Sequence, residues 1–188
     1  MSKKEDILER ALTLFTKEGY ENVGIQKIVT DSNVTKPTLY HYFGSKKGLL
    51  NAVLDFYFSP FLDGLTEKCI YNGDVVFILE SVVKHYFSLV KLKPEIYRFM
   101  LSLVFSSKES EARNTALPYM EREFRAIESL FIAAEKDHGN MKGRSYNFTK
   151  SFLGMIITYT TNSFFGGNEI DDQKAHEACR QFMYGIFS

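Results

Sequence analysis

The sequence lacks most features that mark secreted or membrane-bound proteins. It has only two cysteines in 188 residues, Cys69 and Cys179, far apart in the chain, which is typical of a reducing compartment. No uncharged apolar run reaches the roughly 18 residues that a membrane helix requires. The charged, amphipathic N-terminus does not resemble a signal peptide. We therefore expect a cytoplasmic protein that does not contact a membrane.

Catalytic motifs are also missing. The sequence has no Gly-rich phosphate loop, no Gly-x-Ser-x-Gly elbow and no His-Glu-x-x-His. His176 and Cys179 stand three residues apart and could share a metal ion, but Cys179 belongs to an apolar stripe and no third ligand lies nearby in sequence. We expect no enzyme, no cofactor and no metal site. The third function class, an enzyme on a helical scaffold, would need evidence that the protein turns over a bound small molecule.

Acidic residues are absent from one informative segment. Asp31 is followed by no carboxylate until Asp55, although about three would be expected by chance in a window of this length. The basic side chains inside this gap are Lys36, His41, Lys46 and Lys47. The first 50 residues hold 8 Lys and Arg against 6 Asp and Glu, and the remainder 15 against 17. A local positive charge of this kind favours contact with phosphate.

The same segment predicts a short helix that begins after Thr35. Thr35 is a suitable N-cap, and proline is accepted in the first helical turn. At about 100° per residue, the helix has an outward side and an inward side that can pack with Val34. The outward residues are Lys36, Pro37, Tyr40 and His41. The inward residues are Leu39, Tyr42 and Phe43.

Two apolar stripes before this segment complete a three-helix unit. The first stripe comprises Ile7, Leu8, Ala11, Leu12 and Phe15, and Gly19 follows it as a natural helix end. Ile25, Ile28 and Val29 form the second. Ser32 and Asn33 make the turn, with Asn33 expected in the left-handed conformation. The unit therefore reads as a helix-turn-helix.

The first turns of two predicted helices indicate that an external anion binds there. The helices expected after Thr35 and Ser45 open with lysine and have no Asp or Glu in the first turn. Helix N-termini favour negative charge, so this arrangement is mildly unfavourable without a partner. A DNA phosphate would resolve the conflict, because free N–H groups at a helix N-terminus bind phosphate. The alternative is a solvated basic turn.

These motifs resemble the TetR family of bacterial transcriptional regulators. The similarity rests on Ile7–Phe15, Glu18-Gly19-Tyr20, Val34–Phe43 and Ser45-Lys46-Lys47, and covers residues 5–55 closely. Asn33 and Pro37 stand where the family often has glycine. The resemblance implies an all-α homodimer that binds double-stranded DNA. It also implies an effector and dimerisation domain at the C-terminal side. Predicted DNA contacts are Gln26, Thr35, Lys36, Pro37, Thr38, Tyr40, His41, Lys46 and Lys47.

The rest of the chain reads as helices throughout. We expect about nine helices in all, with those after the helix-turn-helix at 46–66, 75–90, 94–106, 115–137, 145–165 and 172 to the end. Pro60 should kink or break the first of these, whereas Pro94 and Pro118 should lie near helix starts. The predicted domains are residues 1–48, which bind DNA, and 49–188, which bind effector and dimerise.

An apolar final helix points to a subunit interface. Chain ends are usually polar and frayed, yet this stripe runs to the penultimate residue. The preceding helix is apolar on more than one side, which requires burial on two faces. Together with the resemblance, this predicts an interface made by Phe152, Met155, Tyr159, Cys179, Phe182, Met183 and Ile186. The alternative is a core within one subunit.

The middle helices are rich in aromatic rings, with 17 Phe and 11 Tyr in the chain but no Trp. Ordinary core packing is one explanation. The other is a cavity for a small hydrophobic or aromatic effector, with His85, Tyr86, Phe99, Phe124 and Tyr159 as candidate lining residues. With the resemblance to the TetR family, the leading function is a homodimeric repressor that an effector releases from a pseudo-palindromic operator. The alternative is an activator or co-regulator that acts through a protein partner.

Overall fold

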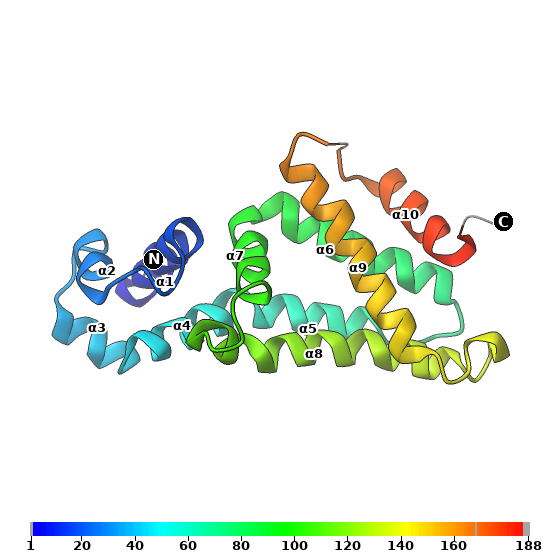
Figure 1. Ribbon diagram of the computed structural model, residues 1–188, viewed down its shortest axis with the longest axis horizontal. Coiled ribbons are helices and arrows are strands. Elements are labelled where there is room, and N and C mark those ends of the chain that lie inside the picture. Colours follow the sequence, from blue (N-terminus) through cyan, green and yellow to red (C-terminus); the bar gives the residue numbers. More distant parts are fainter. Residues whose placement is uncertain (1, 168, 186–188) are drawn as a thin grey trace. The chain divides into compact units, whose positions relative to one another are not determined.

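The computed structural model describes residues 2–167 and 169–185 and is built from helices joined by short loops (Figure 1). The described residues contain no strand, which confirms the all-α fold class. The elements are α1 (Lys3–Glu18), α2 (Ile25–Asp31), α3 (Lys36–Phe43), α4 (Lys46–Tyr57), α5 (Ser59–Lys68), α6 (Val75–Leu92), α7 (Pro94–Val104), α8 (Glu111–Ala134), the 3-10 helix η1 (Gly139–Met141), α9 (Ser145–Phe164) and α10 (Asp172–Tyr184).

The contacts between residues divide the chain into two compact units. Unit 1 consists of Met1–Phe61 and Lys93–Met120, and unit 2 of Leu62–Leu92 and Glu121–Ser188. Two of the three limits between the units fall inside α5 and α8, and the third falls between α6 and α7. Unit 1 includes the whole of the predicted domain 1–48 together with α7. That residues 1–48 act as a domain of their own stays a prediction.

Unit 1 is organised around α1. This helix begins with a capping box, in which the Ser2 hydroxyl accepts from the Glu5 N–H and the Glu5 carboxylate accepts from the Ser2 N–H. It ends at Gly19, whose φ of 83° confirms the predicted helix end. The predicted apolar stripe is buried, and α1 packs against α2, α4 and α7. Phe15 stacks on Phe99 of α7 with ring centroids 6.1 Å apart, so α7 shares the core of the N-terminal helices.

Prolines mark one confirmed and one wrong prediction about helix ends. The predicted helix 46–66 is broken, as Pro60 required: α4 ends at Tyr57 and α5 begins at Ser59. This break accounts for a tenth helix. Pro118, by contrast, lies inside α8 and not near its start. The helix begins four residues earlier than predicted because Ser110 caps it, its hydroxyl accepting from the Arg113 N–H at 3.2 Å.

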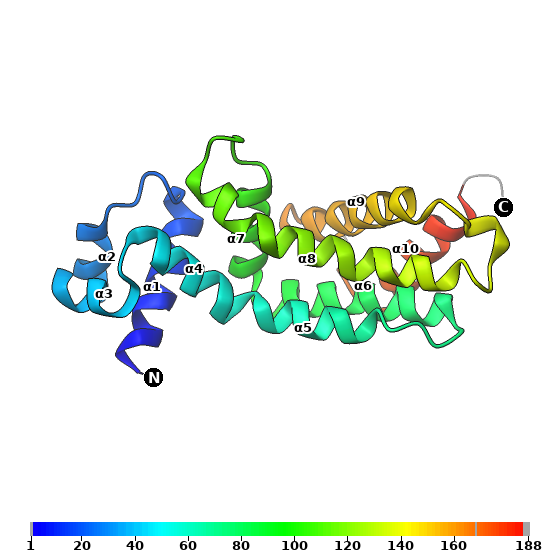
Figure 2. The same ribbon diagram turned by 90° about the horizontal axis from the view of Figure 1, so that it is seen from below.

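Unit 2 is a helical layer in which α6, α9 and α10 pack on one another (Figure 2). Four phenylalanine rings, Phe131, Phe148, Phe152 and Phe182, gather at centroid separations of 5.1–6.4 Å. Such pairs stabilise a core beyond the area that they bury. The ring cluster therefore joins α8, α9 and α10.

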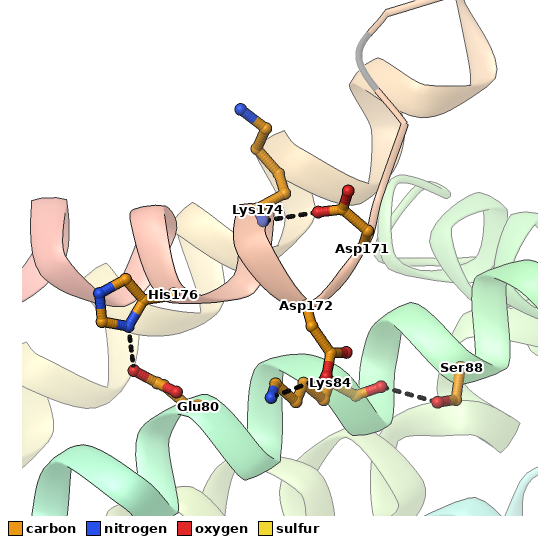
Figure 3. A network of polar contacts seen from close by, with 7 residues as sticks. All are labelled: Glu80, Lys84, Ser88, Asp171, Asp172, Lys174 and His176. Atoms are coloured by element: carbon orange, nitrogen blue, oxygen red, sulfur yellow. Dashed lines mark hydrogen bonds and ion pairs between the residues drawn. The ribbon is translucent and has the colours of Figure 1, made fainter.

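Polar contacts also hold α10 on α6, as Figure 3 shows. His176 Nδ1 lies 2.6 Å from Glu80 Oε1, and Lys84 Nζ donates to Asp172 Oδ2 at 3.0 Å. Asp171 caps α10 by accepting from the Lys174 N–H. The pairs are partly exposed, so each contributes about 0–1 kcal/mol and mainly orients the helix. His176 thus contacts a carboxylate, while Cys179 is fully buried.

Candidate nucleic-acid interface

The helix-turn-helix is formed by α2, a four-residue turn and α3. Asn33 has a φ of 50°, which confirms the predicted left-handed turn residue. The Val34 N–H donates to the Val29 carbonyl at 3.0 Å and closes the turn. Thr35 caps α3 as predicted: its hydroxyl accepts from the Thr38 N–H and lies 2.9 Å from the Thr38 hydroxyl. Local hydrogen bonds therefore fix where α3 starts.

The two sides of α3 differ in exposure. Leu39 and Phe43 are buried, whereas Tyr40 is 46% exposed and His41 is exposed as well. Lys36 and Pro37 also face solvent. Tyr42 is 40% exposed, so its predicted inward position is wrong. A second tyrosine thus joins the outward surface, where its ring contacts His41 edge-on at 5.7 Å.

A glycine fixes the junction between α3 and α4. The Ser45 hydroxyl caps α4 by accepting from the Gly48 N–H at 2.9 Å. A Cβ added at Gly48 would come within 1.9 Å of the Phe43 carbonyl oxygen, which no side chain can tolerate. Backbone this close is possible only for glycine. The end of α3 is therefore held directly against the first turn of α4.

The lysines of this surface are not equivalent. Lys36 and Lys47 are exposed, and neither α3 nor α4 has an acidic residue in its first turn. Lys46 is half-buried. Its Nζ lies 4.2 Å from the centroid of the Tyr20 ring and 3.5 Å from the Glu21 carbonyl oxygen. Burial lowers the pKa of Lys46, although nearby carboxylates oppose this effect. In this conformation Lys46 packs within unit 1.

The partners of Lys46 belong to a polar cluster of unit 1. The Tyr20 hydroxyl donates to Glu111 Oε2 at 2.6 Å, and the Ser110 hydroxyl donates to Glu21 Oε1 at 3.0 Å. The carboxylates of Glu21 and Glu111 favour the charged form of Lys46. The start of α8 therefore contacts the loop that follows α1. Of the other predicted contacts, Gln26 is exposed on α2.

The five predicted effector-pocket residues lie in different surroundings. Phe99 is buried in unit 1 against Phe15, and Phe124 contacts Tyr146 at 5.4 Å. His85 lines a cavity of about 270 Å³, and Tyr159 lines another of about 460 Å³. Tyr86 is buried and its hydroxyl donates to Glu123 Oε1 at 2.7 Å. Their role in effector binding stays a prediction.

Glu123 was missed by the sequence analysis. Burial raises the pKa of its carboxyl group to about 7, although the hydrogen bond from Tyr86 acts in the opposite direction. The sequence did contain a signal. On a helical projection Glu123 falls within the apolar arc of α8, between the directions of Leu130 and Ala134, which are both fully buried. A carboxylate inside such an arc must be buried with a partner.

The predicted interface residues separate by exposure. Phe152 and Cys179 are fully buried and contribute to the core of their own subunit, not to its surface. The half-buried members are Met155, Tyr159, Phe182 and Met183. Ile186 lies outside the described residues. The exposed positions of α9 include Gly154 and Thr158, which were not among the predicted interface residues.

Among the described residues, no helix combines the length and apolar character that a membrane span requires.

A small helical unit that presents an outward basic and aromatic helix after a tight turn defines a helix-turn-helix DNA-binding protein. Comparison with known proteins agrees. Residues 7–53 match the family described as bacterial regulatory proteins, tetR family. Residues 7–53 therefore belong to this TetR family, whose members are DNA-binding transcriptional regulators.

Relatives share this class at low identity. YuxN, an HTH-type transcriptional regulator of Bacillus subtilis, is 31% identical over 94 residues, which is 45% of this chain and 32% of that protein. The Mycolicibacterium smegmatis transcriptional activator FasR is 22% identical over 99% of this chain and 83% of its own. IcaR, a negative regulator of the biofilm operon in Staphylococcus aureus, is 24% identical over 85% of this chain and 70% of its own.

Solved structures share the fold over nearly the whole chain. A protein of Clostridium perfringens, proposed to regulate fatty acid metabolism, superposes with a TM-score of 0.83 at 21% identity, covering 97% of this chain and 99% of that one. FadR of Bacillus subtilis, solved in complex with stearoyl-CoA, superposes with a TM-score of 0.79 at 17% identity, covering 97% and 98%. At these identities the likeness shows the fold alone.

Proposed function

We propose that the protein is a homodimeric repressor that binds a pseudo-palindromic operator and is released from it by a small-molecule effector. The observation that carries the proposal is the exposed face of α3. It presents Lys36, Tyr40 and His41 from a segment without carboxylates. Lysine and tyrosine on an exposed helix are suited to contact phosphates and base edges in the major groove.

The start of α4 adds a second phosphate contact. Its first turn has no carboxylate, and Lys47 is exposed there. Lys46 is the weaker candidate because it packs on Tyr20. We therefore assign phosphate contacts to Lys36 and Lys47. Tyr40 and His41 are assigned to the groove, with Thr35, Pro37 and Thr38 at the N-terminus of α3.

Salt dependence of binding tests the assignment of Lys36. Each lost phosphate contact lowers the magnitude of the slope of log K against log salt by about 0.9, so Lys36→Met should flatten it by about 2 in a dimer. The matched control is Lys17→Met, an exposed lysine on α1. Fluorescence anisotropy measures both. Equal slopes for the two variants would exclude Lys36 as a phosphate contact.

Selection of bound sequences from a random DNA pool tests the symmetry. A dimer with two-fold symmetry should select an inverted repeat. Tyr40→Ala should weaken each half-site by roughly 1–3 kcal/mol if the ring makes a base or phosphate contact. A consensus without an inverted repeat contradicts the homodimeric mode of binding.

The exposed side of α9 supports the dimer. Gly154, Thr158 and Thr161 follow one another along this side at helical spacing, and Ile157 flanks them, half-buried. Small residues allow two helices to approach closely. At the two ends of the same helix lie Tyr146, 56% exposed, and Phe165, 87% exposed.

Gly154 offers a clean test of this interface. A Cβ built there meets nothing within 4 Å in the subunit, and arginine has a higher helix propensity than glycine. Gly154→Arg should therefore leave the subunit folded and prevent dimerisation, which sedimentation velocity would detect. Ser129→Arg, at an exposed position of α8, is the control. A stable Gly154→Arg dimer excludes the exposed side of α9 from the interface.

The effector is the part of the proposal that rests on unit 2. The structure of FadR with stearoyl-CoA shows that a regulator of this fold can hold a small molecule. The second candidate function is a regulator that has no small-molecule effector and acts through a protein partner, which the activator FasR favours. A ligand that binds unit 2 and lowers operator affinity supports the first. Activation of transcription without any such ligand supports the second.

A further inference from the structure

A cleft of about 550 Å³ opens at one end of unit 2. It is lined by the first turns of α6, the last turns of α8, η1, the start of α9 and the end of α10, and is called here the α8–α10 cleft. Figures 1 and 2 both place these helix ends at the same end of the unit. The volume falls in the range of about 300–1,000 Å³ that is usual for small-molecule sites. None of the five effector-pocket residues predicted from sequence lines it.

Aromatic rings form the wall of the cleft. Phe131 is buried at the base of the cleft. The centroid of its ring lies 5.7 Å from that of Phe148 and 6.2 Å from that of Phe182. Phe148 and Phe182 are half-buried, so part of each ring faces the open space. Leu79 of α6 adds an aliphatic surface. This wall suits an apolar group and disfavours a highly hydrated one.

Arg144 supplies a cation beside this apolar wall. Its guanidinium carbon lies 4.6 Å from the centroid of the Phe148 ring, and Nη1 donates to the Asn140 carbonyl at 3.3 Å. A guanidinium has five N–H donors arranged in a plane. Stacking on a ring keeps the edge of that plane accessible, so donors remain for an incoming anion. Arg144 is exposed and can be reached from solvent.

His138 places a second nitrogen at the cleft. Its Nε2 is buried and has no hydrogen-bond partner among the described residues. A buried polar atom without a partner is unfavourable, and the imidazole would have to turn toward the cleft before a ligand oxygen could satisfy this nitrogen. The cleft lining contains no Asp or Glu, and Asp137, adjacent to His138 in sequence, is not part of it. The charged and polar groups of the cleft therefore favour an anion.

We propose that the α8–α10 cleft binds an organic monoanion with an apolar body, whose carboxylate is held by Arg144 while the body contacts Phe148 and Phe182. The proposal rests on the proposed function, for which it supplies the chemical class of the effector. A neutral or cationic molecule of the same shape would lose the charge-assisted hydrogen bonds that the guanidinium offers.

Calorimetry with decanoate as the probe tests this site, with decanol as the uncharged analogue. The full-length protein should bind decanoate about tenfold more tightly than decanol, and about tenfold more tightly than octanoate, because two methylene groups are then removed from the apolar wall. Arg144→Gln should weaken decanoate binding about tenfold and leave decanol unchanged. The control is Lys142→Gln, since Lys142 is also exposed and lies only two residues away.

Three results would overturn the proposal: no binding of decanoate, equal binding of decanoate and decanol, or equal loss in the Arg144→Gln and Lys142→Gln variants. The operator assay separates this proposal from the function on which it rests. If decanoate binds as expected but leaves operator affinity unchanged, the site stands and effector-controlled release fails. If another class of ligand releases DNA while decanoate does not bind, the function stands and this site fails.

Discussion

Replacing Glu123 by glutamine should make the protein more stable than the wild type at alkaline pH. At acidic pH this advantage should be much smaller. Glu123 accepts a hydrogen bond from the buried Tyr86 hydroxyl at 2.7 Å. Glutamine keeps an oxygen that can accept this bond but carries no charge. The substitution therefore removes the ionisation of a buried carboxyl group and preserves its contact with Tyr86.

The size of the effect follows from the pKa of Glu123. Burial raises it from an ordinary value of 4.5 to about 7 in the folded protein. Below pH 4.5 the group is protonated in both states and changes nothing. As the pH rises from 4.5 to 7, the unfolded chain loses its proton first, so the folded state is progressively destabilised. Each pKa unit corresponds to about 1.4 kcal/mol, which gives at most about 3.5 kcal/mol above pH 7. Because Glu123 is only part-buried by surface area, we expect about 1–3 kcal/mol.

Urea denaturation at a fixed protein concentration measures this difference. At pH 8, Glu123→Gln should unfold with a free energy about 1–3 kcal/mol above the wild type, and the advantage should largely disappear at pH 5. Glu121→Gln is the control, because Glu121 is exposed on the same helix and should change stability by less than about 0.5 kcal/mol at either pH. An advantage for Glu123→Gln that is the same at both pH values would refute the raised pKa. A loss of stability at pH 8 would show that the carboxylate is ionised and paired.

Two further predictions concern the DNA-binding unit. Gly48→Ala should destabilise unit 1 by more than about 3 kcal/mol in urea denaturation, since its Cβ would overlap the backbone. The control is Gly24→Ala in the same unit, where a Cβ meets nothing within 4 Å and the change should stay below about 1 kcal/mol; a stable Gly48→Ala variant would contradict the close approach. Lys47→Met should flatten the salt slope of DNA binding by about 2 per dimer, while Lys46→Met should leave the slope unchanged and lower stability by up to about 1 kcal/mol through the lost contact with the Tyr20 ring. If Lys46→Met flattened the slope and Lys47→Met did not, Lys46 and not Lys47 would contact the phosphate.

The sequence alone determined the features that depend on neighbours along the chain. The Thr35 cap, the left-handed Asn33 and the outward position of Tyr40 all follow from side-chain chemistry and helical spacing over a few residues. The break near Pro60 is equally local, because proline removes one donor and clashes with the preceding turn. These local rules were sufficient to predict the helix-turn-helix and the exposure of Tyr40, but they wrongly placed Tyr42 on the inward side.

Only the tertiary structure decided which side chains meet across the fold. Lys46 stands at a helix start without carboxylates, as a phosphate ligand would. Its ammonium group instead packs on the ring of Tyr20, which follows α1. Phe152 and Cys179 have the spacing of an interface stripe but pack inside one subunit. The α8–α10 cleft is likewise assembled from helix ends far apart in the chain, with Arg144 at its edge. Helical periodicity shows which side of a helix is apolar. It does not say which partner covers that side, because this depends on contacts between residues distant in sequence.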